Sequence, residues 1–449
     1  MTAPSDLPQV DTDAIAALAA ELRDLIGLDA VTDETAALSR ASVDGSEMSP
    51  VILEQLPLGR AQLIALPSTA EEIALTVGAA VRHGVPITPR GKGTGNYGQA
   101  IPMAGGLVLD MSRARTVVEV GDGYITADAG ASMIALEQAA NKTGQQLLMF
   151  PSTVQSSIGG FVSGGSGGTG SIEHGMLHTG YVTALDVVHA VPDAALVHLE
   201  GTDTEPYLHN YGVTGIVARV TVKLEPMQAW QAFYASFEDF HDAFALVTPF
   251  AEMTPTPRLV SADLSVLADA LPNDPALPAG RASLRAILDP ASVEAATAMV
   301  EAAGGTVEAI RDGLQQTMKL SMTSYNHPIE WLMKAKAATG ETYFHIEVNG
   351  AALVDRIDEV HQAYPGAMLH LEGQKGRPIG MLAAPYTGAE DVWAGFERLT
   401  ALGVGFHNPH QWFVDYEPQR ARALAASTDP QGLLNPGKLV EPTVATGGK

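Results

Sequence analysis

The sequence contains no cysteine among its 449 residues. This absence excludes disulfide bonds, zinc sites built from thiolates, and cysteine nucleophiles. Bases are also scarce, because 26 lysines and arginines stand against 51 aspartates and glutamates, and the formal net charge is −25. A surface this acidic repels phosphate backbones and anionic lipids, so we expect neither nucleic acid nor a membrane as a partner.

Long apolar runs are missing as well. No window approaches the roughly 20 consecutive apolar residues that cross a bilayer, and the first residues lack the basic and then apolar pattern of a secretory signal. We therefore expect a cytoplasmic protein. The chain is too long for one hydrophobic core, so two or three domains are expected.

A strand–helix–strand unit is predicted directly before a glycine-rich loop. Segments 63–67 and 85–88 have strand character, and apolar residues at helical spacing occupy 68–84 between them. Ser68 and Glu71 have the spacing of a capping box, which places the start of the helix.

The loop that follows contains G-x-G-x-x-G at Gly93, Gly95 and Gly98. A Rossmann nucleotide site needs a helix directly after these glycines, with the pyrophosphate at its N-terminus. Here Pro102 interrupts what would be the first turn, so a Rossmann site is not expected. Consecutive backbone N–H groups in a glycine-rich turn can still bind an anion.

A second glycine-rich region spans 151–175 and offers the same backbone donors. Two such loops in one domain can clamp a long cofactor that carries a diphosphate. The alternative is that both loops are ordinary flexible turns, since short glycine motifs often match by chance.

The rest of the chain alternates strands and helices. A hairpin is predicted over 116–130, and further strands over 182–191 and 215–226. From about residue 229 the order strand, helix, strand occurs three times. This order predicts a mixed α+β domain with its helices on one face of a sheet.

Four segments together resemble a known family: PRGKGTGNYG (89–98), the region from FPST to EHG (150–175), YGVTGIVARVTVKL (211–224) and TDPQGLLNPGKL (428–439). In this order they are similar to the signatures of flavoproteins related to vanillyl-alcohol oxidase and p-cresol methylhydroxylase (PCMH).

The resemblance implies an α+β fold with three parts. A PCMH-type FAD-binding domain of two α+β subdomains would span 1–228, with its core at 55–228. A mixed α+β cap with an antiparallel sheet would span 229–404 and shape the substrate cavity. The segment 405–449 would return to the FAD-binding domain.

The resemblance also implies FAD in an extended pose. The first loop would hold the pyrophosphate, 151–153 would lie near the flavin ring, and Ile216 would pack on the adenine end. The implied FAD-binding residues are Arg90, Gly91, Lys92, Gly93, Thr94, Gly95, Asn96, Pro151, Ser152, Thr153, Ser157, Gly159, Gly160, His174, Gly175 and Ile216.

One departure concerns the covalent flavin link that many members carry. Thr94 stands where they have a first-loop histidine, and the chain has no cysteine for a second link. We therefore expect dissociable, non-covalent FAD, with a link through His174 as the alternative.

The densest polar segment, 405–417, supplies the first catalytic candidates: His407, Asn408 and His410. Histidine titrates near neutral pH and can accept a proton, and Asn408 can hold a substrate oxygen. On a strand, Asn408 and His410 would share a face with Phe406, and His407 would lie opposite. The alternative is an ordinary edge strand.

Tyr343 and His345 are further catalytic candidates on one strand face, together with Glu347. If the strands are neighbours, His345 and Glu347 can meet His370 and Glu372 in a metal site. Related 2-hydroxyacid dehydrogenases carry their metal in a histidine-containing segment that is absent here, so no metal is predicted.

Two basic residues, Lys375 and Arg377, can bind a substrate carboxylate or reduced flavin, or lie on the surface. The segment 324–331, with His327, is interpreted as a loop.

The predicted function is an FAD-dependent oxidase or dehydrogenase. It would oxidise a small alcohol, hydroxy acid, amine or phenolic substrate by hydride transfer to flavin N5. Oxygen or a separate acceptor would take the electrons, and a homodimer is one alternative for the oligomeric state. Two further alternatives are an NADPH-fed flavin reductase and a non-catalytic module that binds flavin or nucleotide.

Overall fold

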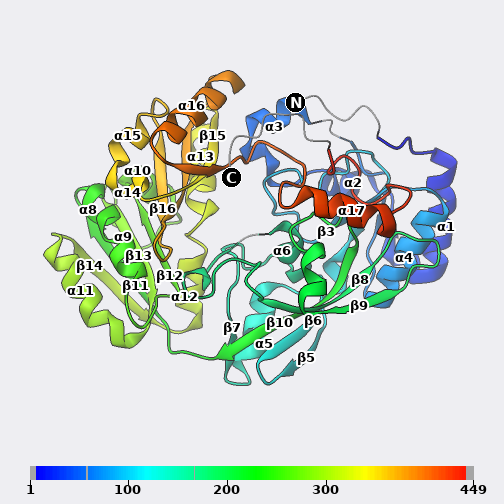
Figure 1. The fold of residues 1–449 in the computed structure, drawn as a ribbon, viewed down its shortest axis with the longest axis horizontal. Coiled ribbons are helices and arrows are strands. Elements are labelled where there is room, and N and C mark those ends of the chain that lie inside the picture. The colour runs from blue at the N-terminus through cyan, green and yellow to red at the C-terminus, as the bar shows by residue number, and fades with distance from the viewer. Residues whose placement is uncertain (1–6, 57–58, 166, 441–449) are drawn as a thin grey trace.

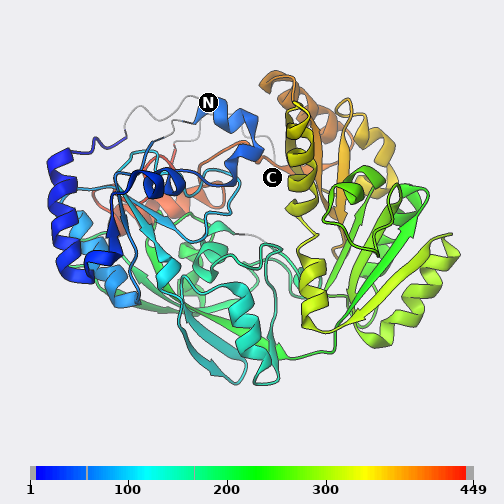
Figure 2. The same cartoon turned by 180° about the vertical axis from the view of Figure 1, so that it is seen from behind.

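Two lobes make up the molecule, as both views show (Figures 1 and 2). The computed structural model describes residues 7–56, 59–165 and 167–440. One lobe holds a four-stranded and a six-stranded sheet, and the other is built on an eight-stranded sheet. No helix of the described residues combines the length and the apolar character that crossing a membrane requires.

The four-stranded sheet has the order β1-β2-β4-β3 and delivers the first glycine-rich loop. Its strands β2, β3 and β4 are parallel, and β1 pairs antiparallel with β2. The strands and the helices beside them are β1 (Val31–Thr32), β2 (Leu63–Ala65), β3 (Ile87–Arg90), β4 (Leu107–Asp110), α1 (Thr12–Ile26), α2 (Thr35–Ala41), α3 (Pro50–Gln55) and α4 (Ala70–Arg82).

Helix α4 begins one residue later than the capping-box prediction. Thr69 is the N-cap, and its hydroxyl oxygen accepts a hydrogen bond from the backbone N–H of Glu72 at 3.1 Å. The Glu72 carboxylate in turn accepts from the backbone N–H of Ser68 at 2.7 Å. The prediction of Ser68 and Glu71 was therefore wrong by one position, because the Thr-x-x-Glu set competes with it at equal spacing.

The six-stranded sheet has the order β5-β6-β10-β8-β9, with β7 on β10, and all its pairs are antiparallel. The hairpin predicted over 116–130 is confirmed as β5 and β6. The elements are β5 (Val117–Gly121), β6 (Tyr124–Asp128), β7 (Gln145–Leu147), β8 (Val182–Val188), β9 (Leu196–Glu200), β10 (Ile216–Pro226), α5 (Met133–Asn141), α6 (Ile158–Gly164) and α7 (Ser171–His174).

The eight-stranded sheet is antiparallel throughout and has the order β14-β11-β13-β12-β16-β17-β15-β18. Its strands are β11 (Gln231–Phe237), β12 (Leu259–Asp263), β13 (Ala282–Leu288), β14 (Thr306–Asp312), β15 (Tyr343–Asn349), β16 (Met368–Glu372), β17 (Ile379–Pro385) and β18 (Gly405–His407).

Helices cover both faces of this sheet, so the expectation of one covered face was wrong. Both faces of β11 are apolar: Phe233 packs in the main core, and Tyr234 packs in a second cluster with Leu320 of α12. Helices on the main-core face are α8 (Phe240–Ala245), α9 (Val247–Ala251), α11 (Val293–Ala302), α14 (Ala352–Asp355), α15 (Ile357–His361) and α16 (Ala389–Ala401). Those on the other face are α10 (Ser265–Ala270), α12 (Leu314–Ser321) and α13 (Asn326–Ala338).

Helix α13 also corrects the interpretation of 324–331 as a loop. Pro328 lies in the first turn of the helix, where a missing backbone N–H costs nothing. Short 3-10 helices complete the described elements: η1 (Leu28–Ala30), η2 (Gly45–Met48), η3 (Met111–Arg113), η4 (Gly201–Tyr207) and η5 (Pro290–Ser292).

The C-terminal segment joins the lobes. It starts in the eight-stranded sheet, where β18 pairs with β15, and crosses to the other lobe, where α17 (Pro418–Thr428) lies (Figure 1). There Leu434 forms a parallel bridge with Ile87 of β3. The end of the chain therefore packs behind the strand that carries the first glycine-rich loop.

Candidate active site

A cavity of about 460 Å³ lies between the two lobes. One wall comes from the first glycine-rich loop, the second glycine-rich region and the turn at 209–217. The opposite wall comes from the eight-stranded sheet and the start of α13. The residues that line this opposite wall are Tyr325, Asn326, Glu330, Glu347, Ile379, Met381 and His407.

The first loop presents bare backbone to this cavity. A Cβ added at Gly91 would clash with the Ser157 hydroxyl, and one added at Gly93 would clash with the Arg90 guanidinium. Among the described residues, no group accepts a hydrogen bond from the backbone N–H groups of 92–96. A run of free N–H groups on a cavity wall is the arrangement that binds an anion. No helix follows Gly98, so the context differs from a Rossmann site, as expected.

The closing motif of the chain supports this loop from behind. The ammonium group of buried Lys438 donates to the carbonyl of Gly98, and the Asn435 side chain donates to the carbonyl of Gln99 at 2.9 Å. Burial lowers the pKa of Lys438 to about 7, with Asp44 acting in the opposite direction. The Asp429 carboxylate accepts from the backbone N–H of Leu433 and of Leu434 and so fixes the turn of the motif.

The two glycine-rich regions are bonded to each other. The hydroxyls of Thr94 and Ser156 lie 2.9 Å apart, and Ser156 donates to Thr153 at 2.7 Å. Ser157 is the N-cap of α6, and Gly159 packs against the backbone of Ala129 so closely that a Cβ would clash. The two loops therefore form one continuous wall.

Most of the predicted FAD-binding residues line this wall. They are Arg90, Gly91, Lys92, Gly93, Thr94, Gly95, Asn96, Pro151, Ser152, Thr153, Ser157, Gly159, Gly160 and Ile216. His174 and Gly175 are not among the lining residues, because they end the short helix α7, and His174 forms an ion pair with Glu225 at 3.0 Å.

An imidazole between two carboxylates forms the polar end of the cavity. His407 on β18 is the cross-strand partner of Glu347 on β15, and their Nδ1 and Oε2 atoms lie 3.2 Å apart. The other nitrogen of His407 lies 2.6 Å from the Asp415 carboxylate. The Tyr97 hydroxyl, from the first loop, donates to Glu347.

The charges of this cluster are tightly coupled. Burial acts to lower the pKa of His407, but the bonds to Asp415 and Glu347 raise it to about 10. Burial acts to raise the pKa of Glu347, and His407 outweighs it, so the pKa is lowered. At neutral pH the cluster therefore holds one imidazolium and two carboxylates, and His407 is not the free base that its sequence position suggested.

The structure does not bring the other histidine and asparagine candidates to the cavity. Strand β18 ends at His407, so the predicted face shared by Phe406, Asn408 and His410 does not form. Asn408 accepts from the backbone N–H of His410 at 2.9 Å. The ring of His410 is buried against the Ser49 hydroxyl at 2.7 Å, and burial lowers its pKa to about 3.

Tyr343 and His345 share the face of Glu347 but also lie outside the lining. Tyr343 packs in an apolar cluster with α13, and fully buried His345 donates from Nδ1 to the carbonyl of Met48 at 3.3 Å. Strand β17 separates β15 from β16, so His345 and Glu347 do not meet His370 and Glu372. The described residues contain no group of histidines and acids arranged as metal ligands.

The two basic candidates are exposed. Lys375 pairs with Glu173, and Arg377 lies beside Gly405. Neither lines the cavity.

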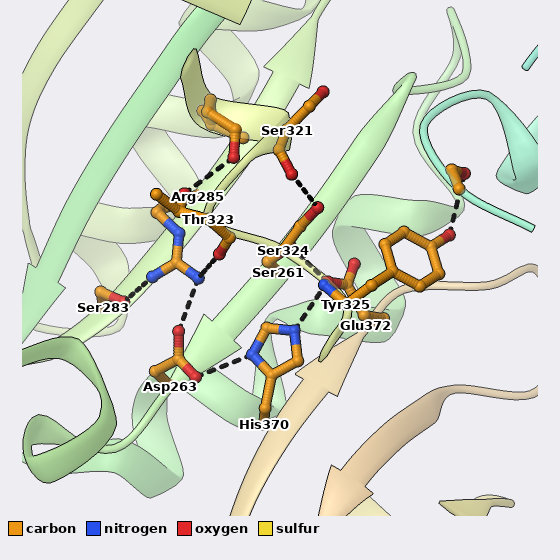
Figure 3. Close-up of polar contacts among 12 residues, drawn as sticks. Ser261, Asp263, Ser283, Arg285, Ser321, Thr323, Ser324, Tyr325, His370 and Glu372 are labelled. Atoms are coloured by element: carbon orange, nitrogen blue, oxygen red, sulfur yellow. Dashed lines mark hydrogen bonds and ion pairs between the residues drawn. The ribbon is translucent and has the colours of Figure 1, made fainter. Parts of the chain in front are cut away.

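A buried network of charged groups supports the wall at Tyr325 (Figure 3). The Asp263 carboxylate lies 2.5 Å from Arg285 and 2.7 Å from Nδ1 of His370, and Nε2 of His370 lies 2.7 Å from Glu372. Glu372 also accepts from the backbone N–H of Tyr325 at 2.6 Å. Tyr325 has a φ of +53°, so this bond holds a strained backbone.

The Tyr325 hydroxyl donates to the carbonyl of Gly168 at 2.8 Å. Tyr325 thus links Glu372 of β16 to the second glycine-rich region through its backbone N–H and its hydroxyl. Burial acts to lower the pKa of His370, but Asp263 and Glu372 raise it to about 9, so His370 is protonated at neutral pH.

Sequence reasoning missed Tyr97, Asp415 and Tyr325 at this site. Glu347 was noted only as a metal candidate, although its place on an alternating strand with His345 gave a usable signal. No local pattern marks Tyr97 or Asp415, because each becomes significant only through a partner distant in the chain.

The comparisons agree with this geometry. A family model described as an FAD binding domain matches residues 61–200. FAD is therefore the cofactor, and the bare wall of the first loop fits its diphosphate. The FAD-binding domain holds both glycine-rich regions that line the cavity.

Relatives also match mainly through this FAD-binding domain. An uncharacterised FAD-linked oxidoreductase of Mycobacterium tuberculosis is 31% identical over 195 residues, which cover 41% of this chain and 42% of the relative. A glycolate oxidase subunit of Bacillus subtilis is 32% identical over 170 residues, 36% of each chain. The matched segments thus cover about two fifths of the length of these relatives, or less. These oxidoreductases support the prediction of an enzyme.

Solved structures show that the fold extends beyond the FAD-binding domain. An alkyldihydroxyacetonephosphate synthase aligns with a TM-score of 0.73 and 16% identity, covering 97% of this chain and 87% of that one. The 4-ethylphenol oxidase of Gulosibacter chungangensis aligns with a TM-score of 0.66 and 17% identity over 98% of both chains. The α+β fold class, with its PCMH-type FAD-binding domain and an antiparallel sheet in the second lobe, is confirmed.

Proposed function

We propose that the protein is an FAD-dependent oxidoreductase of the vanillyl-alcohol oxidase type. It oxidises a small alcohol, hydroxy acid, amine or phenolic compound, and oxygen or a separate acceptor takes the electrons. One observation carries the proposal: free backbone donors at 92–96 and the Tyr97–Glu347–His407 cluster line the same cavity.

The FAD-binding residues have distinct roles in this proposal. The N–H groups of 92–96 hold the diphosphate, and Ser157, Gly159 and Gly160 bind the ribose and adenine side. Residues 151–153 lie beside the flavin ring, and Ile216 packs on the adenine end. The cofactor is bound without a covalent link, since Thr94 occupies the first-loop position and His174 is not on the lining.

The polar cluster binds the substrate in this proposal. Bound FAD would supply the hydride acceptor for the carbon that is oxidised. The ionised Glu347 accepts a hydrogen bond, and then the proton, from the heteroatom on that carbon. His407 contacts one oxygen of the Glu347 carboxylate and keeps the group ionised and oriented. The Tyr97 hydroxyl, from the first loop, donates to the other oxygen. Glu347 replaces the histidine base that the sequence suggested.

The eight-stranded lobe acts as the cap in this proposal, with boundaries near 229 and 404. Tyr325 and the aliphatic residues Ile379 and Met381 close the cavity from this side. An enclosed site strengthens the electrostatic contacts of Glu347 and shields the flavin from water.

A visible spectrum of the purified protein tests the cofactor, because bound FAD gives a yellow protein. Anaerobic mixing with a panel of alcohols, hydroxy acids, amines and phenols tests the activity, because a substrate bleaches the flavin. Bleaching by NADPH alone would favour a reductase. A yellow protein that no organic substrate bleaches would indicate a binding module and would contradict the proposal.

A further inference from the structure

The wall that the eight-stranded lobe contributes to the cavity is acidic. Its charged lining residues are Glu330, Glu347 and His407, and among the described lining residues this lobe supplies no lysine or arginine. The positive charge of His407 is already shared by Glu347 and Asp415. Two carboxylates and one imidazolium leave this cluster with one net negative charge.

Glu330 extends the acidic wall. It lies on α13 beside His327, with Nδ1 of that histidine 3.4 Å from its carboxylate. Burial acts to raise the pKa of Glu330, and His327 outweighs it, so the pKa is lowered. Glu330 and Glu347 both line the cavity from the eight-stranded lobe, so the two carboxylates belong to one wall.

The basic lining residues stand on the opposite side. Arg90 donates to the carbonyl of Val43 at 2.6 Å and lies against Gly93, and Lys92 lies in the same loop. Both therefore flank the place proposed for the FAD diphosphate. The two basic candidates on the other side, Lys375 and Arg377, are exposed and outside the lining.

We propose that this site takes substrates without a carboxylate, namely alcohols or amines whose O–H or N–H donates to Glu347, and rejects 2-hydroxy acids. The inference rests on the proposed function and narrows its substrate class. It also separates this chain from the relative named glycolate oxidase subunit, whose name specifies a carboxylate substrate.

The physical reason is charge repulsion in an enclosed site. A substrate carboxylate beside Glu347 would meet a like charge, and the cation of this wall, His407, is already paired with Glu347 and Asp415. At about 4 Å and the effective dielectric of a partly enclosed site, such a pair repels strongly enough to reduce binding by at least about 100-fold. A neutral hydroxyl or amine instead supplies the donor that an ionised carboxylate accepts.

The chemistry balances with groups already named. The bond from carbon to hydrogen breaks, and both of its electrons leave with the hydride to the flavin. The heteroatom loses its proton to Glu347, and a carbon–oxygen or carbon–nitrogen double bond forms. The oxidised product is a carbonyl compound or an imine, and the reduced flavin is reoxidised by the acceptor.

Matched pairs of substrates test the proposal on the FAD-loaded enzyme. Glycolate is compared with ethylene glycol, lactate with 1,2-propanediol, and mandelate with benzyl alcohol and benzylamine. The rate of anaerobic flavin bleaching is measured for each. We expect at least one neutral or amine member to react at least about 100-fold faster than its acid. Faster reaction of the acids would overturn the inference.

A binding assay separates this inference from the proposed function. Benzoate and benzamide have similar shapes and differ in charge, and either perturbs the flavin spectrum when bound beside it. We expect benzamide to bind at least about tenfold more tightly. If benzoate binds as tightly, the inference fails whether or not any compound is oxidised. If benzamide is preferred but nothing bleaches the flavin, the proposed function fails and the charge preference stands.

The variant Glu347→Gln tests the residue itself. It keeps the shape of the side chain and removes the charge, so the preference for benzamide should fall toward unity while FAD content stays unchanged. Glu359→Gln, an exposed carboxylate paired with Arg356 far from the lining, is the matched control and should keep the preference. A preference that persists in Glu347→Gln would contradict the role assigned to Glu347.

Discussion

Substituting Asp263 by asparagine should strongly destabilise the eight-stranded lobe. Asp263 is fully buried between Arg285 and His370 (Figure 3), and the substitution changes its charge without changing its shape. It leaves no cavity, so any loss of stability reports electrostatics rather than packing.

The structure gives the expected size of the loss. The guanidinium of Arg285 keeps only neutral partners, the Ser283 hydroxyl at 2.5 Å and the Thr323 carbonyl at 2.8 Å. Removing one member of a buried ion pair typically costs about 3–5 kcal/mol, because the other charge is left unpaired. For a lobe of this size that loss corresponds to a fall in melting temperature of roughly 10 °C.

Thermal unfolding followed by circular dichroism measures the shift. Glu359→Gln, in an exposed ion pair, is the control and should give no measurable change. The double variant Asp263→Leu/Arg285→Met removes both charges and should recover part of the loss. If Asp263→Asn has the melting temperature of the wild type, or if the double variant is no more stable than the single one, the reasoning about an unpaired guanidinium is refuted.

Three further predictions concern the loop and the cavity. In Gly91→Ala the new methyl clashes with the Ser157 hydroxyl, so FAD should bind roughly 10- to 100-fold more weakly in fluorescence titrations, and the added Ser157→Ala should restore part of the affinity. His407 has a pKa raised to about 10 in the folded state, so the charged histidine should stabilise the fold relative to His407→Gln. In thermal melts this stabilisation should be complete below about pH 6.5 and lost as the pH rises through 10. Lys438 has a pKa lowered to about 7, so the wild type should gain stability relative to Lys438→Met as the pH rises from 7 to 10.5 in urea titrations. A constant difference across pH would contradict either titration.

The loops could be predicted from the sequence because their properties are local. Glycines that give a side-chain-free backbone and a proline that prevents a helix act within a few residues of each other, so Gly91 and Pro102 are informative by themselves. The strand–helix–strand unit before the loop is equally local. In this unit the N-cap of α4 lies at Thr69, one residue after the predicted Ser68, because two capping motifs of equal spacing overlap there.

The cap wall could not be predicted in the same way. Glu347 and His407 are 60 positions apart and meet because β15 and β18 pair with a register that places them opposite each other. The sequence indicates each strand but not which strands pair, so the same residues also allowed a metal site with His370 and Glu372. The position of β17 between β15 and β16, unassigned from the sequence, decides against that arrangement.

The C-terminal segment connects the two halves of the proposed chemistry. Its first part places His407 and Asp415 at the polar end of the cavity, and its last part places Asn435 and Lys438 behind the first glycine-rich loop. The same loop sends Tyr97 across to Glu347, so the backbone that faces the diphosphate and the hydroxyl that orients the carboxylate share one short segment. A shift of this loop must therefore alter the cofactor wall and the substrate wall together. It follows that Lys438→Met, although outside the cavity lining, should change flavin affinity and the rate of flavin bleaching in parallel.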